Sequence, residues 1–427
     1  MTKATMQLDI EQANAANERE RAILVGIDRP GLHGGLFERM EELSLLADTA
    51  GCDTVASLTQ ARDRPDSRTY IGKGKVDELV ALAEEYEADV IIIDSELPPS
   101  QSRNLETAVG RKIVDRTQLI LDIFARRAST RLARDQVELA LLQYSLPRLK
   151  RMWTHLSRIE GGVGMRGPGE RQIETDRRLA RERIHRLQQR LVEAEQQKAV
   201  SNASRQRAFT VSLVGYTNVG KSTLMNALTE AGVFVENRLF ATLDATTRRL
   251  EVEGDELLLS DTVGFIRDLP HALVASFHAT LAEVREADLL LHVVDIASPE
   301  LDEQIASVRT VLEEIGAQDQ PTLMVFNKVD ALEDGLSAEG IAQRHGGGVL
   351  ISARENRGLD ELRQALIERL RAHHRPVELI IPYADGKAAA IVEQRGQVLD
   401  REYLDTGVKL RALLPPEDLA RLENYVL

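Results

Sequence analysis

The sequence predicts a multidomain α/β protein, and three observations lead to this prediction. The chain has 427 residues, which is too long for one compact core. Apolar, strand-like runs alternate with amphipathic helical runs in two separate stretches, which favours parallel sheets covered by helices. A long, basic, helical segment lies between these stretches. We therefore expect an N-terminal α/β domain followed by a long helical hairpin, a central doubly wound domain and a small C-terminal α+β domain.

The first domain is expected over residues 21–125. Residues 1–20 are polar and lack apolar periodicity, which is typical of a mobile tail. AILVGI (22–27) predicts a buried strand, and LFERMEELSLLADTAG (36–51) predicts an amphipathic helix closed by glycine. The alternation continues through 53–60, 77–88, 89–94 and 112–115, which favours a small domain with a largely parallel sheet.

Residues 126–200 are expected to form a basic helical hairpin. Helical character begins at Asp115 and is interrupted at Pro147, and the glycine-rich GGVGMRGPGE (161–170) precedes a second long helical pattern over 172–200. Residues 101–210 hold 23 Lys and Arg against 12 Asp and Glu, a net charge of +11. The whole chain carries −14, so the remainder carries −25. Such a segment is either a footprint for a phosphate backbone or a pair of arginine-rich helices solvated on one face.

The central domain, expected over 205–372, begins with a phosphate-binding pattern. GYTNVGKS (215–222) follows the apolar run FTVSLV and leads into a helix, where the glycines let backbone N–H groups face phosphates. Lys221 is expected to neutralise the β- and γ-phosphates, and the Ser222 hydroxyl to bind Mg²⁺. The nucleotide contacts expected from this P-loop are Gly215, Tyr216, Thr217, Asn218, Val219, Gly220, Lys221 and Ser222.

A second phosphate-side motif, DTVG (261–264), follows the apolar run ELLLS. Asp261 at the end of that strand can hold the Mg²⁺ shell, and the Gly264 amide can meet the γ-phosphate. Thr262 and Val263 are expected contacts of the same turn. The next residue is Phe265, where small regulatory GTPases carry a glutamine that orients the attacking water. We therefore expect slow hydrolysis unless another group or a partner positions the water.

Two motifs later in the chain predict the base specificity. In NKVD (327–330) the Asp330 carboxylate can accept the N1–H and N2–H groups of guanine, which adenine does not offer. Asn327 can tether the P-loop, and the stem of Lys328 can cover the ring face. In SAR (352–354) the Ala353 N–H is available to guanine O6. The other contacts expected from these motifs are Val329, Ser352 and Arg354. Four motifs in this order predict a site for GTP and GDP.

The segment LFATLDATTR (239–248) lies between the P-loop and DTVG. One of its threonines can complete the Mg²⁺ shell when a γ-phosphate is present. Thr242 is our choice, although the spacing also allows Thr246 or Thr247, and an ordinary polar loop is the alternative. The expected nucleotide contacts here are Phe240, Ala241, Thr242, Leu243 and Asp244. The groups expected to act in catalysis are Lys221, Thr242 and Gly264.

The end of the chain and its composition complete the prediction. Arg375-Pro376 ends the central domain, and the strand-like VELIIPY and VKLRALL predict a small α+β domain over 375–427. A single cysteine, Cys52, fits a reducing compartment. No apolar run is long enough to span a bilayer, and the polar N-terminus lacks a signal peptide. We therefore expect a cytoplasmic protein without a membrane span.

At this point the sequence resembles the HflX family of translation-associated GTPases over nearly its whole length. The resemblance is carried by YIGKGKVDEL (70–79), GGVGMRGPGE with RQIETDRR (161–178), GYTNVGKS, LFATLDATTR, DTVGFIRDLP (261–270), NKVD and SAR. The glycine-rich loop and LFATLDATTR are specific to the family, whereas the other motifs occur across GTPases.

The resemblance implies that the basic segment docks on the large ribosomal subunit under the control of GTP and promotes separation of stalled or idle ribosomes. It also implies that Ser222 and Thr242 are the Mg²⁺ ligands. We expect the protein to be a monomer. An ATPase activity of the N-terminal region is a further implication, but GKGK (72–75) lacks the GKS ending of a P-loop. The alternatives are a switch that gates a protein partner without contacting RNA, and a general ATPase.

Overall fold

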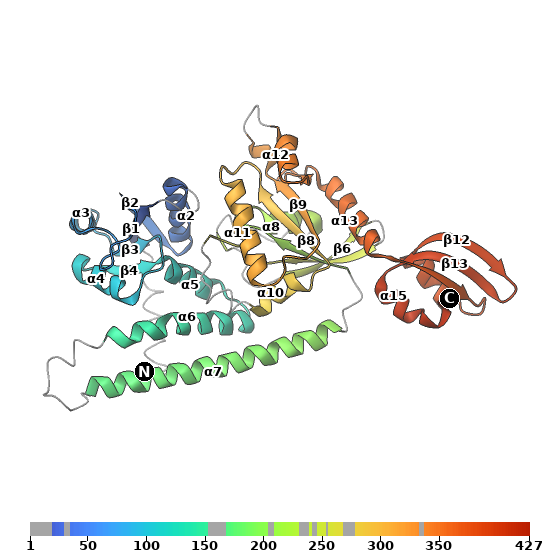
Figure 1. Ribbon diagram of the computed structural model, residues 1–427, viewed down its shortest axis with the longest axis horizontal. Coiled ribbons are helices and arrows are strands. Elements are labelled where there is room, and N and C mark those ends of the chain that lie inside the picture. Colours follow the sequence, from blue (N-terminus) through green and yellow to red (C-terminus); the bar gives the residue numbers. More distant parts are fainter. Residues whose placement is uncertain are drawn as a thin grey trace. The chain divides into compact units, whose positions relative to one another are not determined.

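The structure is a computed structural model with three described β-sheets (Figure 1). The sheets have four, six and three strands, which confirms the predicted multidomain α/β fold. The four-stranded sheet belongs to one compact unit of the chain, and the other two sheets belong to a second unit. The residues described are 19–29, 35–152, 168–203, 209–229, 239–240, 246–252, 255–267, 278–332 and 337–427.

The N-terminal sheet has the order β2-β1-β3-β4 and is parallel throughout, as predicted. Its strands are β1 (Glu20–Asp28), β2 (Cys52–Ala61), β3 (Val90–Ile93) and β4 (Lys112–Asp115). Its helices are α2 (Leu36–Thr49), α3 (Lys73–Glu85), α4 (Pro99–Val109) and α5 (Arg116–Arg127). All of 22–27 in β1 and 90–93 in β3 are buried, because central parallel strands are covered on both faces.

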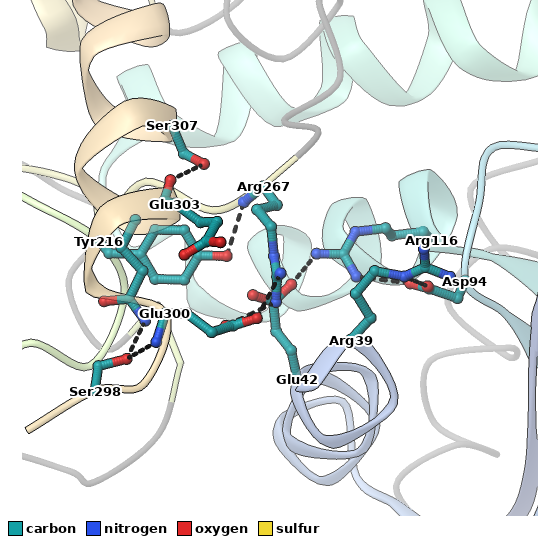
Figure 2. Close-up of polar contacts among 11 residues, drawn as sticks. Arg39, Glu42, Asp94, Arg116, Tyr216, Arg267, Ser298, Glu300, Glu303 and Ser307 are labelled. Atoms are coloured by element: carbon teal, nitrogen blue, oxygen red, sulfur yellow. Dashed lines mark hydrogen bonds and ion pairs between the residues drawn. The ribbon is translucent and has the colours of Figure 1, made fainter. Parts of the chain in front are cut away.

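A buried ionic cluster lies after the carboxyl end of β3 (Figure 2). Asp94 accepts hydrogen bonds from Arg39 Nε and from Arg116 Nη1, both at 3.0 Å, and Arg116 also pairs with Glu42. All four side chains are at least nine-tenths buried. Because buried charges require partners, this cluster fixes α2 and α5 against the end of the sheet.

The predicted helical hairpin is formed by α6 (Arg131–Met152) and α7 (Pro168–Ala203). Arg183 donates two hydrogen bonds of 2.7 Å to Glu138, and the apolar side chains of the two helices pack beside this pair. Residue 190 pairs with 135 and residue 183 pairs with 138, which shows that the two helices run antiparallel. The apolar contact is formed by Leu139, Leu187 and Leu191, with Ile184 beside them.

The predicted interruption at Pro147 is wrong. α6 continues through Pro147, and the break in the helical segment lies at 128–130, between α5 and α6. Arg148 follows the proline and donates to the Leu97 carbonyl at 2.9 Å and to Asp115 at 3.0 Å. These tertiary contacts hold the helix on the N-terminal domain and offset the backbone hydrogen bond that proline cannot make.

The central sheet has the order β10-β9-β8-β5-β7-β6. Its strands are β5 (Phe209–Val214), β6 (Thr246–Val252), β7 (Asp255–Asp261), β8 (Leu289–Asp295), β9 (Thr322–Asn327) and β10 (Val349–Leu350). Its helices are α8 (Lys221–Thr229), α10 (His278–Arg285), α11 (Leu301–Glu314), α12 (Ala338–Arg344) and α13 (Leu359–His373). Strand β6 runs antiparallel to β7 and was not predicted, because 239–248 was interpreted as a segment of nucleotide and Mg²⁺ contacts, with an ordinary polar loop as the alternative.

The C-terminal sheet is antiparallel, with the order β11-β13-β12. It consists of β11 (Arg375–Ile381), β12 (Gln397–Leu404) and β13 (Gly407–Leu414), with α14 (Gly386–Arg395) and α15 (Pro416–Arg421). Its own apolar core includes Leu379, Val392 and Leu410, all at most 2% exposed. Among the residues described, no helix combines the length and the apolar character needed to cross a bilayer.

Candidate nucleotide site

The P-loop connects β5 to α8 and curls around the side chain of Lys221. The Lys221 ammonium donates to the carbonyl oxygens of Gly215 at 3.0 Å and Tyr216 at 2.8 Å, and the side chain is buried. A Cβ atom on Gly215 would lie 2.3 Å from the Val293 carbonyl oxygen of β8. Only glycine therefore allows the loop to pass so close to the neighbouring strand.

The turn after DTVG is joined to the P-loop by backbone hydrogen bonds. The Thr217 N–H donates to the Phe265 carbonyl at 2.7 Å, and the Phe265 N–H donates to the Gly215 carbonyl at 3.1 Å. Figure 2 shows the next contact, in which the Arg267 N–H donates to the Tyr216 hydroxyl at 2.9 Å. The Phe265 side chain is 2% exposed, so this residue contributes backbone pairing and core packing.

Arg267 continues this connection into α11. Its guanidinium makes two hydrogen bonds to Glu300, at 2.8 and 3.1 Å, and Glu300 directly precedes α11 (Figure 2). Planar two-point pairing of this kind restricts the guanidinium strongly. The sequence analysis did not single out either residue, and their separation of 33 positions gave no local signal.

Two oxygen groups suited to Mg²⁺ meet where α8 begins and β7 ends. Ser222 Oγ donates to Asp261 Oδ2 at 2.6 Å. Hydroxyl and carboxylate oxygens are ligands that Mg²⁺ accepts, so the residue types and their proximity fit the ion. Thr242, the other predicted ligand, lies outside the described residues. The alternatives Thr246 and Thr247 lie in β6, where the Thr247 hydroxyl is 2.9 Å from that of Ser260.

The base-specificity motifs and the P-loop meet at Asn327, the last residue of β9. Asn327 Nδ2 donates to the Val219 carbonyl of the P-loop at 2.8 Å. Its Oδ1 accepts the Ala353 N–H of the SAR motif at 2.9 Å. The side chain is 3% exposed, so both bonds are shielded from water. Asn327 thus joins its own loop to the SAR loop, 26 positions away, and to the P-loop, 108 positions away.

Lys328 occupies a left-handed backbone conformation, with φ of +65°, between Asn327 and the short 3-10 turn η2 (Val329–Ala331). Its ammonium lies 2.6 Å from Asp295 Oδ2. Asp295 ends β8 and was not among the predicted site residues. Its position at the carboxyl end of a central strand was the available signal.

The remaining predicted contacts fall into three groups. Those with exposed side chains are Asn218, Asp330 and Arg354. Those in buried positions include Val263, Ser352 and Thr262, whose hydroxyl donates to the Leu213 carbonyl at 2.6 Å. The third group belongs to LFATLDATTR (239–248). Phe240 packs edge-on against Phe124 of α5 with ring centroids 4.6 Å apart, and Ala241, Leu243 and Asp244 lie outside the described residues.

The environment of Lys221 predicts a pH dependence of nucleotide affinity. In the protein alone, burial lowers the pKa of Lys221 to about 8, against a smaller raising effect from Asp261. We expect phosphate oxygens beside the ammonium in the nucleotide complex, and they would raise that pKa, so above pH 8 the complex would hold more protons than the free protein. Affinity for GDP should therefore be flat below pH 8 and fall above it, by at most about tenfold per pH unit.

Titration calorimetry with GDP from pH 6.5 to 9.5 measures this effect. GMP is the matched control, because it shares the titrating base but lacks the β-phosphate that Lys221 is expected to contact. A decline of the same size for GMP and GDP would assign the pH dependence to the base instead of to Lys221.

The order and placement of these motifs define the class of protein. The P-loop follows β5, DTVG follows β7, NKVD closes β9 and SAR follows β10, all at the carboxyl ends of strands of one sheet. This is the arrangement of a P-loop GTPase domain. A family model described as "50S ribosome-binding GTPase" matches residues 210–328.

Two further family models cover the preceding part of the chain. The "GTP-binding GTPase N-terminal" model matches residues 37–125, and the "GTP-binding GTPase Middle Region" model matches residues 127–205. The chain is 46% identical to the GTPase HflX of Magnetococcus marinus over 415 residues, which is 95% of each chain. It is 43% identical to the GTPase HflX of Caldanaerobacter subterraneus, over 96% of this chain and 95% of the relative.

A solved structure described as the SsGBP and GDP complex is also similar. Its TM-score is 0.47 at 24% identity, and the match covers 82% of this chain and 98% of that one. The identity and coverage of the curated relatives place the chain in the HflX family of GTPases. The protein accordingly binds and hydrolyses GTP.

Proposed function

We propose that this GTPase binds the large ribosomal subunit in a GTP-dependent manner and promotes dissociation or rescue of stalled or idle ribosomes. The observation that carries the proposal is the match of residues 210–328 to a ribosome-binding GTPase model, within a chain related over 96% of its length to a member of one family. The protein would act as a monomer in the cytoplasm, where ribosomes are found.

The basic helical hairpin, residues 126–200, is the proposed contact with ribosomal RNA. Arg181 and Arg186 of α7 are exposed, and neither has an ion pair within the part of the chain that the structure describes. Arg131 at the start of α6 is also exposed. Exposed arginines without acidic partners are available to phosphate groups, which supports a phosphate backbone as the ligand.

The nucleotide site supports hydrolysis that depends on docking. Lys221 would neutralise the β- and γ-phosphates, the Gly264 amide would face the γ-phosphate, and Ser222 with Thr242 would hold Mg²⁺. Mg²⁺ supplies charge neutralisation between the phosphates when bound. Phe265 offers no polar side-chain atom and is buried, so it cannot orient water. A group supplied on docking would complete the site, and hydrolysis by the protein alone would be slow.

Co-sedimentation with purified large subunits tests the proposal. We expect strong pelleting with GTP or a non-hydrolysable analogue and weak pelleting with GDP. The double substitution Arg181→Glu and Arg186→Glu should reduce pelleting by about tenfold or more, because each reversed charge removes a phosphate contact. The control, Arg344→Glu with Lys387→Glu, makes the same change in net charge at exposed positions outside the hairpin.

Equal pelleting with all three nucleotides would contradict nucleotide-controlled docking. Pelleting that is independent of salt between 50 and about 200 mM would instead favour a protein partner, because binding to RNA weakens steeply as counterions compete. Subunit separation is measured in the same samples by the ratio of free subunits to intact ribosomes.

A further inference from the structure

A cavity of about 460 Å³ lies in the GTPase domain, away from the nucleotide motifs. It is bounded by the start of β9, the last turns of α11 and the loop before β10, whereas the nucleotide motifs follow the carboxyl ends of the strands. Its volume is within the range of sites for small ligands. The polar side chains that line it belong to His292, Arg309, Glu313, Gln318, Thr322, His345 and Arg369.

His292 is an unusual residue for the middle of a central strand. It pairs with Val214 of β5 and Met324 of β9, and its side chain is 2% exposed. Its Nε2 atom is buried and has no hydrogen-bond partner among the residues that the structure describes. A buried polar atom without a partner costs about 1–3 kcal/mol. Because His292 is one of the residues that line the cavity, a polar ligand bound there would lie beside this imidazole and could offer it a partner.

The charges around His292 favour a negatively charged ligand. Arg309 of α11 and Arg369 of α13 line the cavity, are exposed, and have no ion pair within the described ranges. Glu313 is the acidic lining residue, and the other ionisable one, His345, lies 3.3 Å from Asp302. Burial, Arg309 and Lys221 together lower the pKa of His292 to about 3. Two arginines against one glutamate in the lining favour an anionic ligand.

We propose that this cavity binds a small, multiply charged oxyanion, which Arg309 and Arg369 hold at the rim and the His292 imidazole contacts inside. Phosphate and carboxylate groups share the required chemistry, since both accept charge-assisted hydrogen bonds from guanidinium groups. The anion site is separate from the GTP site. Strand β8 links the two sites, because it carries His292 and pairs with β5, the strand that leads into the P-loop.

Calorimetry on the full-length protein tests the proposal, with 1 mM GDP in cell and syringe so that the P-loop stays occupied. Pyrophosphate and citrate are titrated separately. We expect saturable binding of at least one, and the responding anion identifies phosphate or carboxylate as the ligand class. Arg309→Gln and Arg369→Gln should each weaken it by about tenfold, the effect of one lost charge-assisted contact. Arg344→Gln, an exposed arginine of α12 outside the lining, should leave it unchanged.

Histidine NMR gives an independent readout of the inner contact. At pH 7 the anion should shift the imidazole ¹⁵N signals of His292, assigned by their loss in His292→Gln, and leave the exposed His185 unmoved. Absence of binding by both anions up to about 10 mM would overturn the proposal, since a site weaker than that has little use at cellular concentrations. Undiminished binding in the Arg309→Gln, Arg369→Gln double variant would also overturn it, by placing the anion elsewhere.

Discussion

Asp330→Asn is expected to lower affinity for GTP by about 10²–10⁴-fold and to make xanthosine triphosphate the preferred nucleotide. The carboxylate is proposed to accept two hydrogen bonds from guanine, each worth about 1.5–3 kcal/mol because the acceptor is charged. The amide of asparagine presents a donor where N1–H or N2–H needs an acceptor. Xanthine carries a carbonyl oxygen in place of the N2 amino group, so the amide suits it.

Competition binding with GTP, ATP and xanthosine triphosphate measures this switch. Asp330 is exposed and lies in a short turn, so the substitution should leave the melting temperature unchanged. Asp302→Asn on α11 is a control of the same chemistry at an exposed position. An unchanged order of nucleotide preference in Asp330→Asn would show that another group reads the base.

Gly220→Ala is expected to reduce GDP and GTP affinity by about 10²-fold or more. Gly220 has φ of +96°, and a Cβ atom there would lie 2.4 Å from Asn327 Nδ2. The methyl group must displace the amide that joins the P-loop to the SAR motif, so two buried hydrogen bonds are lost or lengthened. At about 1–3 kcal/mol for each, their loss accounts for the expected change.

Gly316→Ala separates the steric effect from backbone strain. Gly316 also has positive φ, +73°, but a Cβ atom there meets nothing within 4 Å. Both variants should lose about 1–2 kcal/mol of stability from the left-handed conformation, whereas only Gly220→Ala should lose nucleotide affinity. Comparable affinity in the two variants would show that the Asn327 contact does not position the nucleotide loops.

Much of the fold could be predicted, because it depends on local patterns. Fully apolar runs such as 90–93 identified buried parallel strands, and the long helical pattern over 172–200 identified α7. Pro147 was misinterpreted because local propensity disfavours proline inside a helix, while Arg148 anchors that helix through contacts far away in sequence. Strand β6 was missed because its pairing with β7 gives TTRRLEV an extended structure that its charged residues did not suggest.

The candidate site also has a part that could be predicted from the sequence and a part that could not. The P-loop, DTVG and NKVD were recognisable because their chemistry resides in consecutive residues. Asp295 beside Lys328, and Glu300 beside Arg267, could not be found from spacing, because each pair is brought together only by the packing of α11 and the strands of the sheet. The cavity around His292 had no sequence signal either, since a lone histidine in an apolar run is usually a core residue.

The tight packing of Gly264 over the P-loop has a mechanical consequence. A Cβ atom at Gly264 would lie only 3.2 Å from the Lys221 ammonium nitrogen and 2.8 Å from Thr217 Cγ2. A side chain at position 264 would therefore collide with the P-loop, and glycine is what lets the turn after DTVG keep its Thr217–Phe265 and Phe265–Gly215 backbone hydrogen bonds. At about 0.5–1.5 kcal/mol each, these pairs hold the two segments together, so a ligand that needs them further apart has to bind strongly enough to offset the loss of both bonds.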